Sequence, residues 1–449
     1  YKFIYDKNQT LWMYDGTEGI WEMNVEQKIR TLLRKNLMGD EQQKKNYIEE
    51  ILAHIVDICY NPNFKPDKYI HLIAFKNKVY NLKTNEYIDF SSELFLTNKL
   101  DIIINDDVKD CPLIDKFFAD CVGEKYKALL YDLAAYCLYK EVPYQKLFFV
   151  FGPGGTGKSQ FMNFLEIFLG DNNTCSAEPQ HIENDQYTAQ QMVGKLANIS
   201  SDIKYDALND ITQVKKLTGG DTMKIRKMYK NPYNLKIACK QIFSTNKLPI
   251  VKEKTRVWYR RVFLLPFENI IEEDKVDRNI LKKITSEKEL QGFVHMCLKH
   301  LRELYENDFV FSYDIDEAKM QKMYEELSNP ILMFLNESCV KGVSEYCFKW
   351  EFTERLNAWL KQRHFPPYTK SQINQYMKEY YVESNRPTAF GDKTYRVWSG
   401  LRWKNIDQSD EFNGFNGFNG VGEKVYVSRK CFQNHTKSVK SVKPSEVSL

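Results

Sequence analysis

The chain has 449 residues, of which 43% are hydrophobic and 28% charged, the composition of an ordinary globular protein of roughly three domains. Its 64 Lys and Arg nearly balance 60 Asp and Glu, so the net charge of +4 neither requires nor excludes nucleic acid. No apolar run approaches about 18 residues, so no membrane span is expected. Ten cysteines without a C-x-x-C pair favour free thiols in a reducing cytosol over zinc or disulfides. The first residue is Tyr1 rather than Met, and we expect a fragment that lacks something upstream.

The first part of the chain, residues 1–110, is expected to be an α+β domain. Residues 48–60 have the apolar spacing of a helix, whereas residues 69–90 alternate apolar and polar side chains around two turns, which predicts short strands. Two helices are predicted within 112–140, and we assign residues 111–144 to a helical lead-in.

The stretch FGPGGTGKSQ (151–160) contains the phosphate-binding loop pattern, and residues 145–270 are assigned to an α/β ATPase core around it. Four apolar residues, 147–150, predict a buried strand before the loop, and 160–169 predict a helix after it. Glycines let backbone N–H groups curl around phosphate oxygens, and the helix N-terminus favours negative charge. The predicted cradle comprises Gly152, Pro153, Gly154, Gly155, Thr156, Gly157, Lys158 and Ser159, with Lys158 reaching the β- and γ-phosphates of ATP and Ser159 holding Mg²⁺.

Polar residues follow the next predicted strands. Asp202 ends the apolar run 195–202 and is the natural carboxylate for Mg²⁺ or water, although a turn or capping role is the ordinary alternative. Asn246 ends a predicted strand over 235–246 and could contact the γ-phosphate, but an Asn near Pro is often a turn residue. Arg260 and Arg261 precede an apolar strand and suit phosphate because the guanidinium donates paired hydrogen bonds; solvated arginines are the alternative.

A basic hairpin is predicted between these strands. Residues 222–229 and 233–239 alternate on either side of Lys230-Asn231-Pro232, the signal of a hairpin. From Thr222 to Arg261 there are twelve Lys or Arg and one acidic residue, an excess that needs a local cause in a nearly balanced chain. Contact with a phosphate backbone is one reading and a solvated charged face is the other. The candidate contacts are Lys224, Arg226, Lys227 and Lys230.

The last third is divided by Asn329-Pro330. Residues 271–330 are expected to be helical, for example over 290–308. Helices at 352–365 and 371–381, followed by a hairpin turning at Ser399-Gly400, would form either a winged-helix-like domain over 331–405 or a small helical cap. Three Phe-Asn-Gly units mark residues 406–449 as a linker and flexible tail.

The ordered set of motifs resembles the superfamily 3 helicases, in the branch of phage, plasmid and large-DNA-virus primase-helicases. The loop, the strand ending in an acid, LTGGD with Arg226 five residues after Asp221, the strand ending in Thr-Asn and the aromatic-Arg-Arg run occur in that family's order. The upstream segments 72–82 and 129–159 are also similar to its lead-in. The resemblance covers about residues 65–270 and weakens after 330.

This resemblance implies an AAA+-like ATPase, bound to ATP and Mg²⁺, that assembles as a ring, usually hexameric, and moves along single-stranded DNA in the host cell cytoplasm. It implies that Asp202 is the Walker B acid, that Asn246 is the first sensor, and that Arg260 or Arg261 reaches a neighbour's site. The hairpin becomes the pore element. Members often carry a primase domain upstream and a winged-helix-like module downstream.

Two departures from the family pattern bear on the site. The family usually shows a second acid beside the Walker B acid, but here the next acid after Asp202 is Asp206. Tyr259 stands between Trp258 and Arg260, so the sequence does not decide which arginine is the finger. Two further functions stay open: a ring ATPase that loads or remodels replication proteins, and an origin-binding scaffold with weak ATPase.

Overall fold

A computed structural model of the chain describes residues 2–404, except 37–44, 186, 202, 204–209, 227–230, 247, 250, 252–254, 273, 275, 314, 363–366 and 388–393. The predicted linker and tail over 406–449 therefore lie outside the described residues. Within the described part of the chain, no helix combines the length and apolar character needed to cross a membrane.

A five-stranded, wholly parallel sheet with the order β13-β7-β12-β9-β8 forms the centre of the mixed α/β fold. Helical crossovers connect parallel strands, so the carboxyl ends of all five strands meet at one edge. The strands are β7 Leu147–Phe151, β8 Thr174–Cys175, β9 Ala197–Ser200, β12 Lys240–Thr245 and β13 Val262–Pro266.

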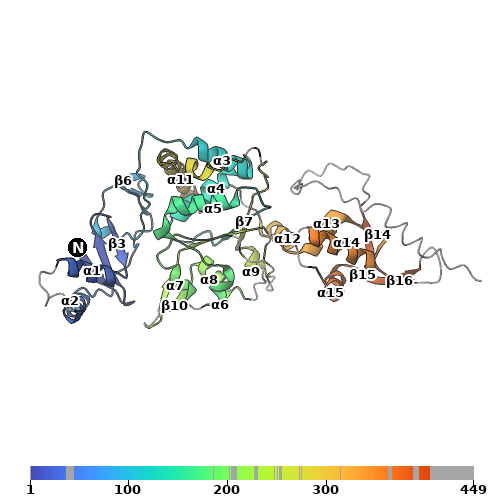
Figure 1. Cartoon of the computed structure of the whole chain (residues 1–449), viewed down its shortest axis with the longest axis horizontal. Helices are drawn as coiled ribbons and strands as arrows, with labels where there is room; N and C mark the ends of the chain where they lie inside the picture. The colour runs from blue at the N-terminus through green and yellow to red at the C-terminus, as the bar shows by residue number, and fades with distance from the viewer. Residues whose placement is uncertain are drawn as a thin grey trace, which may run out of the picture. The chain divides into compact units, whose positions relative to one another are not determined.

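Helices cover both faces of this sheet, which explains why the strands read as continuous apolar runs. Along β7, Leu147 and Phe149 enter one hydrophobic core, and Phe148 and Val150 enter the other. One face is covered by α3 Pro112–Val122, α4 Lys127–Leu138, α5 Lys158–Leu169 and α11 Glu287–Glu306 (Figure 1). The other is covered by α6 Pro179–Asn184, α7 Thr188–Gln191 and α8 Thr212–Gly219. The helices predicted in 112–140, 160–169 and 290–308 and the strand at 147–150 are confirmed.

Buried polar groups inside the sheet satisfy one another. Asn198 is fully buried; its Nδ2 donates to the Ala177 carbonyl and to Gln241 Oε1, both at 2.9 Å, and its Oδ1 accepts from the Ala177 N–H at 2.7 Å. Asn198 therefore ties β9 both to β12 and to the segment before α6. A fully satisfied buried network of this kind fixes one register.

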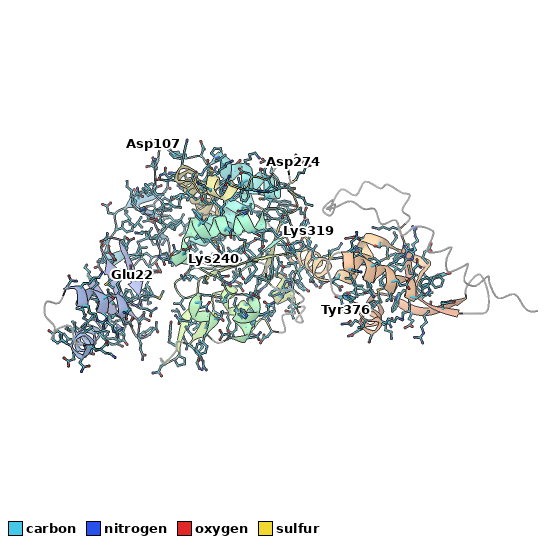
Figure 2. The ribbon with its side chains drawn as sticks, viewed as in Figure 1. Glu22, Asp107, Lys240, Asp274, Lys319 and Tyr376 are labelled. Carbon is cyan, nitrogen blue, oxygen red and sulfur yellow. The ribbon has the colours of Figure 1, made fainter. Side chains whose placement is uncertain are left out.

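Lys240, at the start of β12, is a buried cation (Figure 2). Its amine donates to the Tyr139 carbonyl and lies 5.1 Å from the centroid of the Tyr136 ring. Burial lowers the pKa of the Lys240 amine to about 8. The charge therefore opposes folding at neutral pH, and the ring and the carbonyl offset part of that cost.

Replacement of Lys240 by methionine is expected to reveal this titration. Because the folded pKa lies below the ordinary 10.5 of an exposed lysine, the unfolded wild-type chain binds more protons than the folded one between about pH 8 and 10.5. Wild-type stability should therefore rise relative to Lys240→Met across that window, by up to about 1.4 kcal/mol per pH unit. Urea unfolding of both proteins at pH 7.5 and 9.5 measures the difference. A difference that is independent of pH would mean that the amine titrates normally.

The N-terminal part contains two small antiparallel sheets. The first, β1-β2-β3, and two helices enclose a core of Leu11, Met13, Val25, Ile29 and Leu52. These elements are β1 Lys2–Tyr5, β2 Leu11–Asp15, β3 Ile20–Met23, α1 Glu26–Asn36 and α2 Lys45–Ile58. The second sheet comprises β4 Leu72–Ala74, β5 Val79–Asn81 and β6 Glu86–Ile88. The helix predicted within 48–60 and the short strands predicted within 69–90 are confirmed.

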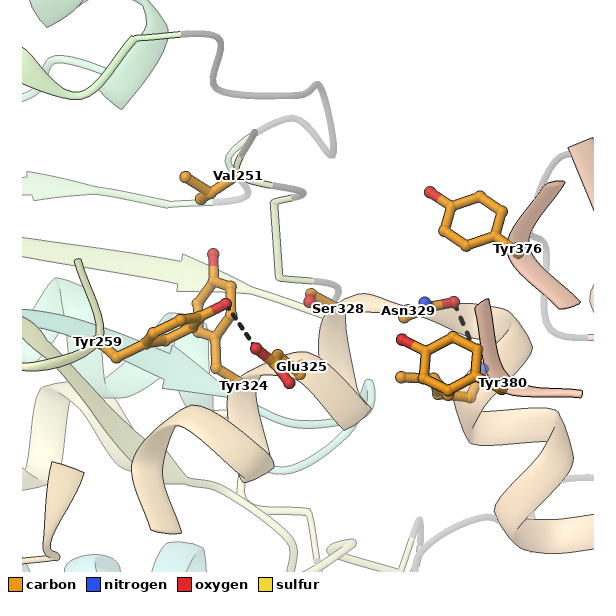
Figure 3. Close-up of a pocket in the computed structure, with 9 residues that line it drawn as sticks. Val251, Tyr259, Tyr324, Glu325, Ser328, Asn329, Tyr376 and Tyr380 are labelled. Carbon is orange, nitrogen blue, oxygen red and sulfur yellow. Dashed lines mark hydrogen bonds between the residues drawn. The ribbon is translucent and has the colours of Figure 1, made fainter. Parts of the chain in front are cut away.

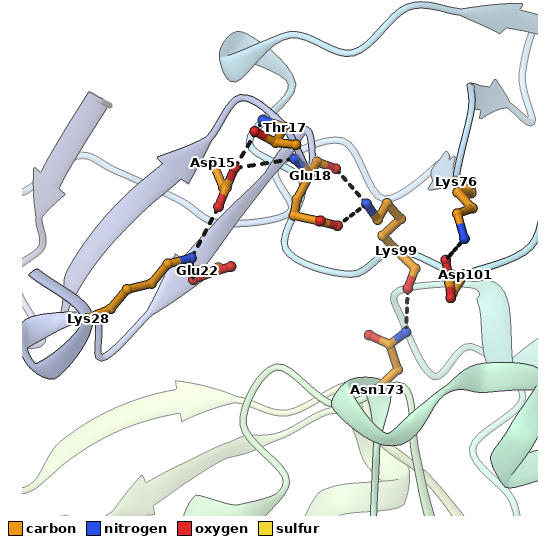
Figure 4. A network of polar contacts seen from close by, with 9 residues as sticks. All are labelled: Asp15, Thr17, Glu18, Glu22, Lys28, Lys76, Lys99, Asp101 and Asn173. Atoms are coloured by element: carbon orange, nitrogen blue, oxygen red, sulfur yellow. Dashed lines mark hydrogen bonds and ion pairs between the residues drawn. The ribbon is translucent and has the colours of Figure 1, made fainter. Parts of the chain in front are cut away.

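Lys99 links the turn between β2 and β3 to the part of the chain that contains the central parallel sheet (Figure 4). Its amine donates to the Glu18 carbonyl at 2.9 Å and to the Glu18 carboxylate. Its own carbonyl accepts from Asn173 Nδ2 at 2.9 Å. Asn98, beside it, donates to Asn173 Oδ1 at 2.9 Å and to the Gly194 carbonyl at 2.8 Å. Side chains just after the second sheet therefore hold this part of the chain against the end of α5 and the segment before β9.

The C-terminal part, 330–404, has its own core around Phe352, Leu356 and Trp398 and an antiparallel sheet of order β14-β16-β15. Its elements are α13 Pro330–Ser338, β14 Cys339–Phe348, α14 Lys349–Gln362, α15 Lys370–Tyr380, β15 Val382–Pro387 and β16 Thr394–Trp403. The two predicted helices are confirmed as α14 and α15. The short α10 Ile280–Ile284 and α12 Glu317–Ser328 precede this part.

The hairpin turn predicted at Ser399-Gly400 is wrong. Gly400 has φ +87° and lies inside one continuous strand, β16. The register with β14 shifts there, because Leu401 faces Lys341 whereas Ser399 faces Tyr346. A glycine with positive φ thus produces an irregularity within the strand and not a reversal of the chain. β16 instead pairs with β15 on one side and on the other with β14, a strand that the sequence reasoning missed.

Candidate functional site

The phosphate-loop sequence forms a tight turn between β7 and α5. Gly152 has φ +157°, and a Cβ there would collide with the Phe267 carbonyl oxygen, so the position requires glycine. Thr156 Oγ1 donates to the Pro153 carbonyl at 3.0 Å, and the Ile271 N–H donates to the Gly155 carbonyl at 3.0 Å. The loop is therefore held both by its own residues and by the segment that follows β13.

The end of the loop positions Lys158. Gly157 caps α5 in the left-handed conformation, φ +85°, and a Cβ there would lie 2.5 Å from Cys121 Sγ of α3. Lys158 is 6% exposed, and its amine donates to the Gly152 carbonyl at 2.8 Å and to the Pro153 carbonyl. The loop carbonyls thus hold the cationic group inside the curve of the backbone.

The open side of the loop fits a phosphate group. Added Cβ atoms at Gly154 and Gly155 would meet no atom within 4 Å. The first turn of the twelve-residue α5 presents backbone N–H groups at this point, where the helix dipole favours an anion. Ser159 is exposed in that turn. In the described part of the chain no three His, Cys, Asp or Glu residues form a group that could hold a metal ion.

Asn246 lies at the same edge of the sheet as the loop. Thr245, the last residue of β12, pairs with Phe151, the last residue of β7, and the exposed Asn246 follows directly. β9 also ends near this edge, because its last residue, Ser200, pairs with Phe243, two residues before Thr245. Asp202, the predicted Walker B acid, lies outside the described residues. Its neighbour Ile203 donates its N–H to the Ser244 carbonyl at 3.1 Å.

The two arginines lie at the opposite edge. β13 runs parallel to β7, with Val262 facing Leu147 and Pro266 facing Phe151. Arg260 and Arg261 precede the first of these pairs, whereas the phosphate loop follows the last. Five residues of strand, about 16 Å at 3.3 Å each, therefore separate the arginines from the loop of their own chain.

The two arginines have different surroundings. Arg260 ends the short helix α9 Arg256–Tyr259 and is exposed. Arg261 is 7% exposed, its Nη1 donates to the Val257 carbonyl at 3.2 Å, and its carbonyl accepts from the Leu147 N–H at 2.7 Å. Burial and the adjacent Arg260 lower the pKa of Arg261, and the carboxylate of Asp221 raises it. Arg261 thus has the surroundings of a structural residue, and Arg260 is the arginine that is accessible to another molecule.

Tyr259, the residue that makes the aromatic-Arg-Arg motif ambiguous in the sequence, has a packing role in the structure (Figure 3). Its ring is buried, and its hydroxyl donates to Glu325 Oε1 of α12 at 3.0 Å. The neighbouring Tyr324 donates to the Pro249 carbonyl at 2.7 Å. Tyr259 therefore joins α9 to α12, and the arginine after it remains at the surface.

The predicted hairpin is present as β10 Thr222–Ile225 and β11 Tyr233–Lys236, which pair antiparallel. Met223 and Ile225 are buried, so the alternate residues lie on the outer face. Lys227 and Lys230 lie outside the described residues, and Arg226 is half-buried. The strand predicted over 235–246 is confirmed as β12 Lys240–Thr245, but its predicted start is wrong, because β11 ends at Lys236 and β12 begins only at Lys240.

Lys236 was missed by the sequence reasoning. It pairs with Thr222, two residues before Lys224, so Lys224 and Lys236 share the exposed face of the hairpin. Strand alternation combined with the pairing register could have identified it.

Asp221 is a second residue that the sequence identifies only as part of LTGGD. Gly219 lies close to both Asp221 and Arg261. A Cβ added to Gly219 would be 3.2 Å from Asp221 Oδ2 and 3.5 Å from Arg261 Nη2.

Comparisons with known proteins match two family models to this chain. Residues 1–123 match the "D5 N terminal like" family, and residues 150–261 match a family of unknown function, DUF5906. A curated protein of Acanthamoeba polyphaga mimivirus, "Putative helicase L207/L206", is 23% identical over 407 residues, which cover 81% of this chain. Over most of its length this chain is therefore similar to a viral protein described as a putative helicase, and its first part is similar to the D5 N-terminal-like family. The chain spans about 40% of the length of the mimivirus protein.

The solved structures similar to this chain include the C-terminal region of NrS-1 in its apo form. It shows 11% sequence identity and a TM-score of 0.43, over 89% of this chain and 95% of that chain. An A-form apo structure of the same region shows 12% identity and a TM-score of 0.41, over 89% and 95% of the two chains.

Proposed function

We propose that this chain is an ATP-dependent DNA helicase of the superfamily 3 type, which acts as a ring on single-stranded DNA during replication of a virus, phage or plasmid. The observation that carries the proposal is the placement of the phosphate loop and Arg260 at opposite edges of one parallel sheet. A chain built in this way needs a second copy to bring an arginine to its ATP. Repetition of the same contact closes a ring, for which we propose six subunits.

The loop side of the sheet would supply the nucleotide chemistry. We assign Gly152 to Ser159 to the cradle of ATP, with Lys158 balancing the β- and γ-phosphate charge. Ser159 and Asp202 would hold Mg²⁺, which when bound offsets the negative charge of the phosphate oxygens. We assign to Asn246, which follows the neighbouring strand end, the role of orienting water or contacting the γ-phosphate.

The hairpin would carry the force to DNA. Its outer face presents Lys224 and Lys236, and Arg226, Lys227 and Lys230 add charge near its tip. Lysines contact phosphates without reading bases, as translocation along arbitrary sequence requires. In a ring each contact is repeated once per subunit, so that weak individual contacts add up to a firm grip.

The central sheet and the C-terminal part support two fold assignments. The strand order around β7 favours an AAA+-like core. In the C-terminal part the order α13-β14-α14-α15-β15-β16, with β16 between the other two strands, favours a winged-helix-like domain over a helical cap. We further propose that the protein works in the host cell cytoplasm and is joined upstream to a primase domain in its full-length form.

A strand-displacement assay tests this function. The purified chain is mixed with a fluorescent forked DNA duplex and either ATP or a non-hydrolysable analogue, in the presence of Mg²⁺. Displacement with ATP alone, together with ATP hydrolysis stimulated by single-stranded DNA, is expected. Hydrolysis that DNA does not change, without displacement, would instead favour a ring ATPase that remodels other proteins.

Removal of the hairpin charges should weaken DNA binding without affecting basal ATP hydrolysis. In a variant with Lys224, Lys227 and Lys230 replaced by alanine, affinity for single-stranded DNA should fall almost equally for all sequences. Each lost phosphate contact should reduce the slope of log affinity against log salt by about 0.7. Titration of labelled oligonucleotides at several salt concentrations measures both quantities, and Lys236→Ala tests the additional residue.

Lys288→Ala, which removes an exposed lysine of α11, is the matched control. An unchanged slope in the triple variant would rule out this hairpin as the DNA contact.

A further inference from the structure

The sheet of the C-terminal part exposes aromatic side chains on one face. Phe348 faces Val397 and Tyr346 faces Ser399, so Tyr346, Phe348 and Tyr395 project to one side of the sheet. The alternate pair, Cys347 and Trp398, projects into the buried core. We call this exposed side, together with two residues at its border, the aromatic sheet face; it comprises Tyr346, Phe348, Trp350, Val382 and Tyr395.

The rings of the aromatic sheet face form one contiguous group. The Phe348 ring contacts the other three, with centroid distances of 5.6 Å to Tyr346, 6.2 Å to Trp350 and 6.1 Å to Tyr395. Tyr346 and Tyr395 are each 39% exposed and Trp350 is 46% exposed. Val382, which pairs with Ser399 on the same face, is 72% exposed. The group is therefore held in place by ring contacts and yet presents much of its surface to solvent.

The C-terminal part that carries these rings has an excess of positive charge. Residues 331–404 contain twelve Lys or Arg and seven Asp or Glu, so this short part carries +5 whereas the whole chain carries +4. On β16, Arg402 is exposed. Arg396 alternates with Tyr395 to the other face of the sheet, where it pairs with Glu383 at 3.7 Å. Glu383 is also paired with Lys349 at 2.9 Å. A polyanion is thus the ligand whose charge complements this surface.

We propose that the aromatic sheet face binds single-stranded DNA by stacking bases on Trp350, Tyr395 and Tyr346. Aromatic side chains on an exposed sheet stack with any base, and a basic side chain nearby, here Arg402, can contact the phosphates. This second contact goes beyond the proposed helicase function. This contact requires no ATP hydrolysis, and the single-stranded DNA would bind at a place other than the β10–β11 hairpin.

Stacking can be separated from charge by comparing two strands of equal length. The full chain is titrated with fluorescent oligo-dT and with an abasic strand that carries the same phosphates but no bases. The wild type should prefer oligo-dT. The double variant Trp350→Ala, Tyr395→Ala should bind oligo-dT roughly tenfold or more weakly and the abasic strand as the wild type does, because each stacked base contributes about 1–3 kcal/mol.

Two matched variants control this comparison. Trp350→Phe keeps a stacking ring and should restore most of the affinity that Trp350→Ala loses. Tyr47→Ala removes a ring of α2 that is 42% exposed and lies far from this face in the sequence, and it should leave binding unchanged. A double variant that retains the full preference for bases overturns the proposal.

Photocrosslinking locates the contact directly. An oligonucleotide that contains 5-iodouracil is irradiated with the full chain, and crosslinked peptides are mapped by mass spectrometry. Crosslinks at Tyr346, Trp350 or Tyr395 are expected, whereas crosslinks confined to 222–236 would overturn the assignment. A change in subunit assembly of the double variant, with DNA binding intact, would instead identify a protein-docking face. These binding assays contain no ATP. A result that excludes the aromatic sheet face as a DNA contact would therefore not contradict the proposed helicase function.

Discussion

Alanine at position 158 is expected to lower the rate of ATP hydrolysis by at least about 10²–10³-fold. The amine of Lys158 lies within the curve of the phosphate loop, bonded to the carbonyls of Gly152 and Pro153. The charge that builds up on the γ-phosphate oxygens during transfer would therefore lose the positive charge of this amine. Steady-state phosphate release at saturating ATP measures the loss.

Folding controls accompany that measurement, because the Lys158 amine also ties the loop together. Thermal unfolding and circular dichroism of Lys158→Ala should match the wild type within a few degrees. Lys288→Ala, an exposed lysine on α11, removes the same charge elsewhere and should hydrolyse ATP normally. Near-normal turnover in a folded Lys158→Ala protein would reject the assignment of this loop as the catalytic cradle.

Replacement of Arg260 by alanine is expected to slow ATP hydrolysis by roughly 10³-fold while ATP binding persists, the effect of losing an arginine finger. Arg260 is exposed, and the length of β13 separates it from the loop of its own chain. Its guanidinium would thus act on ATP held by a neighbour. Arg261→Ala should instead lower the thermal unfolding temperature, because Arg261 is buried and bonds to the Val257 carbonyl.

A mixing experiment distinguishes action between chains from action within one chain. Lys158→Ala and Arg260→Ala proteins are each expected to be inactive. Their mixture should regain some hydrolysis, because a mixed interface can combine an intact loop with an intact Arg260. Mixed assemblies are verified with two affinity tags. Assemblies that form without regaining activity would remove Arg260 from this role.

The sequence predicted the site best where local rules decide structure. The strand 147–150, the loop and the helix after it are specified by a short apolar run, by glycines and by helical spacing, and β10 and β11 by alternation around a proline turn. The resemblance supplied the roles of Asp202, Asn246 and the arginines, and those roles stay predictions. It could not separate Arg260 from Arg261, because burial of the second depends on its contacts with residues near 219–221 and 257.

Errors arose where tertiary pairing overrides local pattern. Ser399-Gly400 has the composition of a turn, yet pairing with β14 and β15 on both sides keeps β16 extended through it. β14 itself was missed because Gly342 and Ser344 interrupt its alternation. The strand break between Lys236 and Lys240 likewise depends on β11 pairing with β10 while β12 enters the central sheet, a choice that no local spacing encodes.

The contact between Gly157 and Cys121 gives this protein a built-in chemical reporter. Cys121 is fully buried, and burial raises the pKa of its thiol to about 12, so at neutral pH it is neither accessible nor ionised. An alkylating reagent can reach the sulfur when the loop and α3 separate. The alkylation rate at this position, read by peptide mapping, is therefore sensitive to opening of the loop. A ligand that clamps the loop would slow that rate, and its occupancy could be followed without any measurement of turnover.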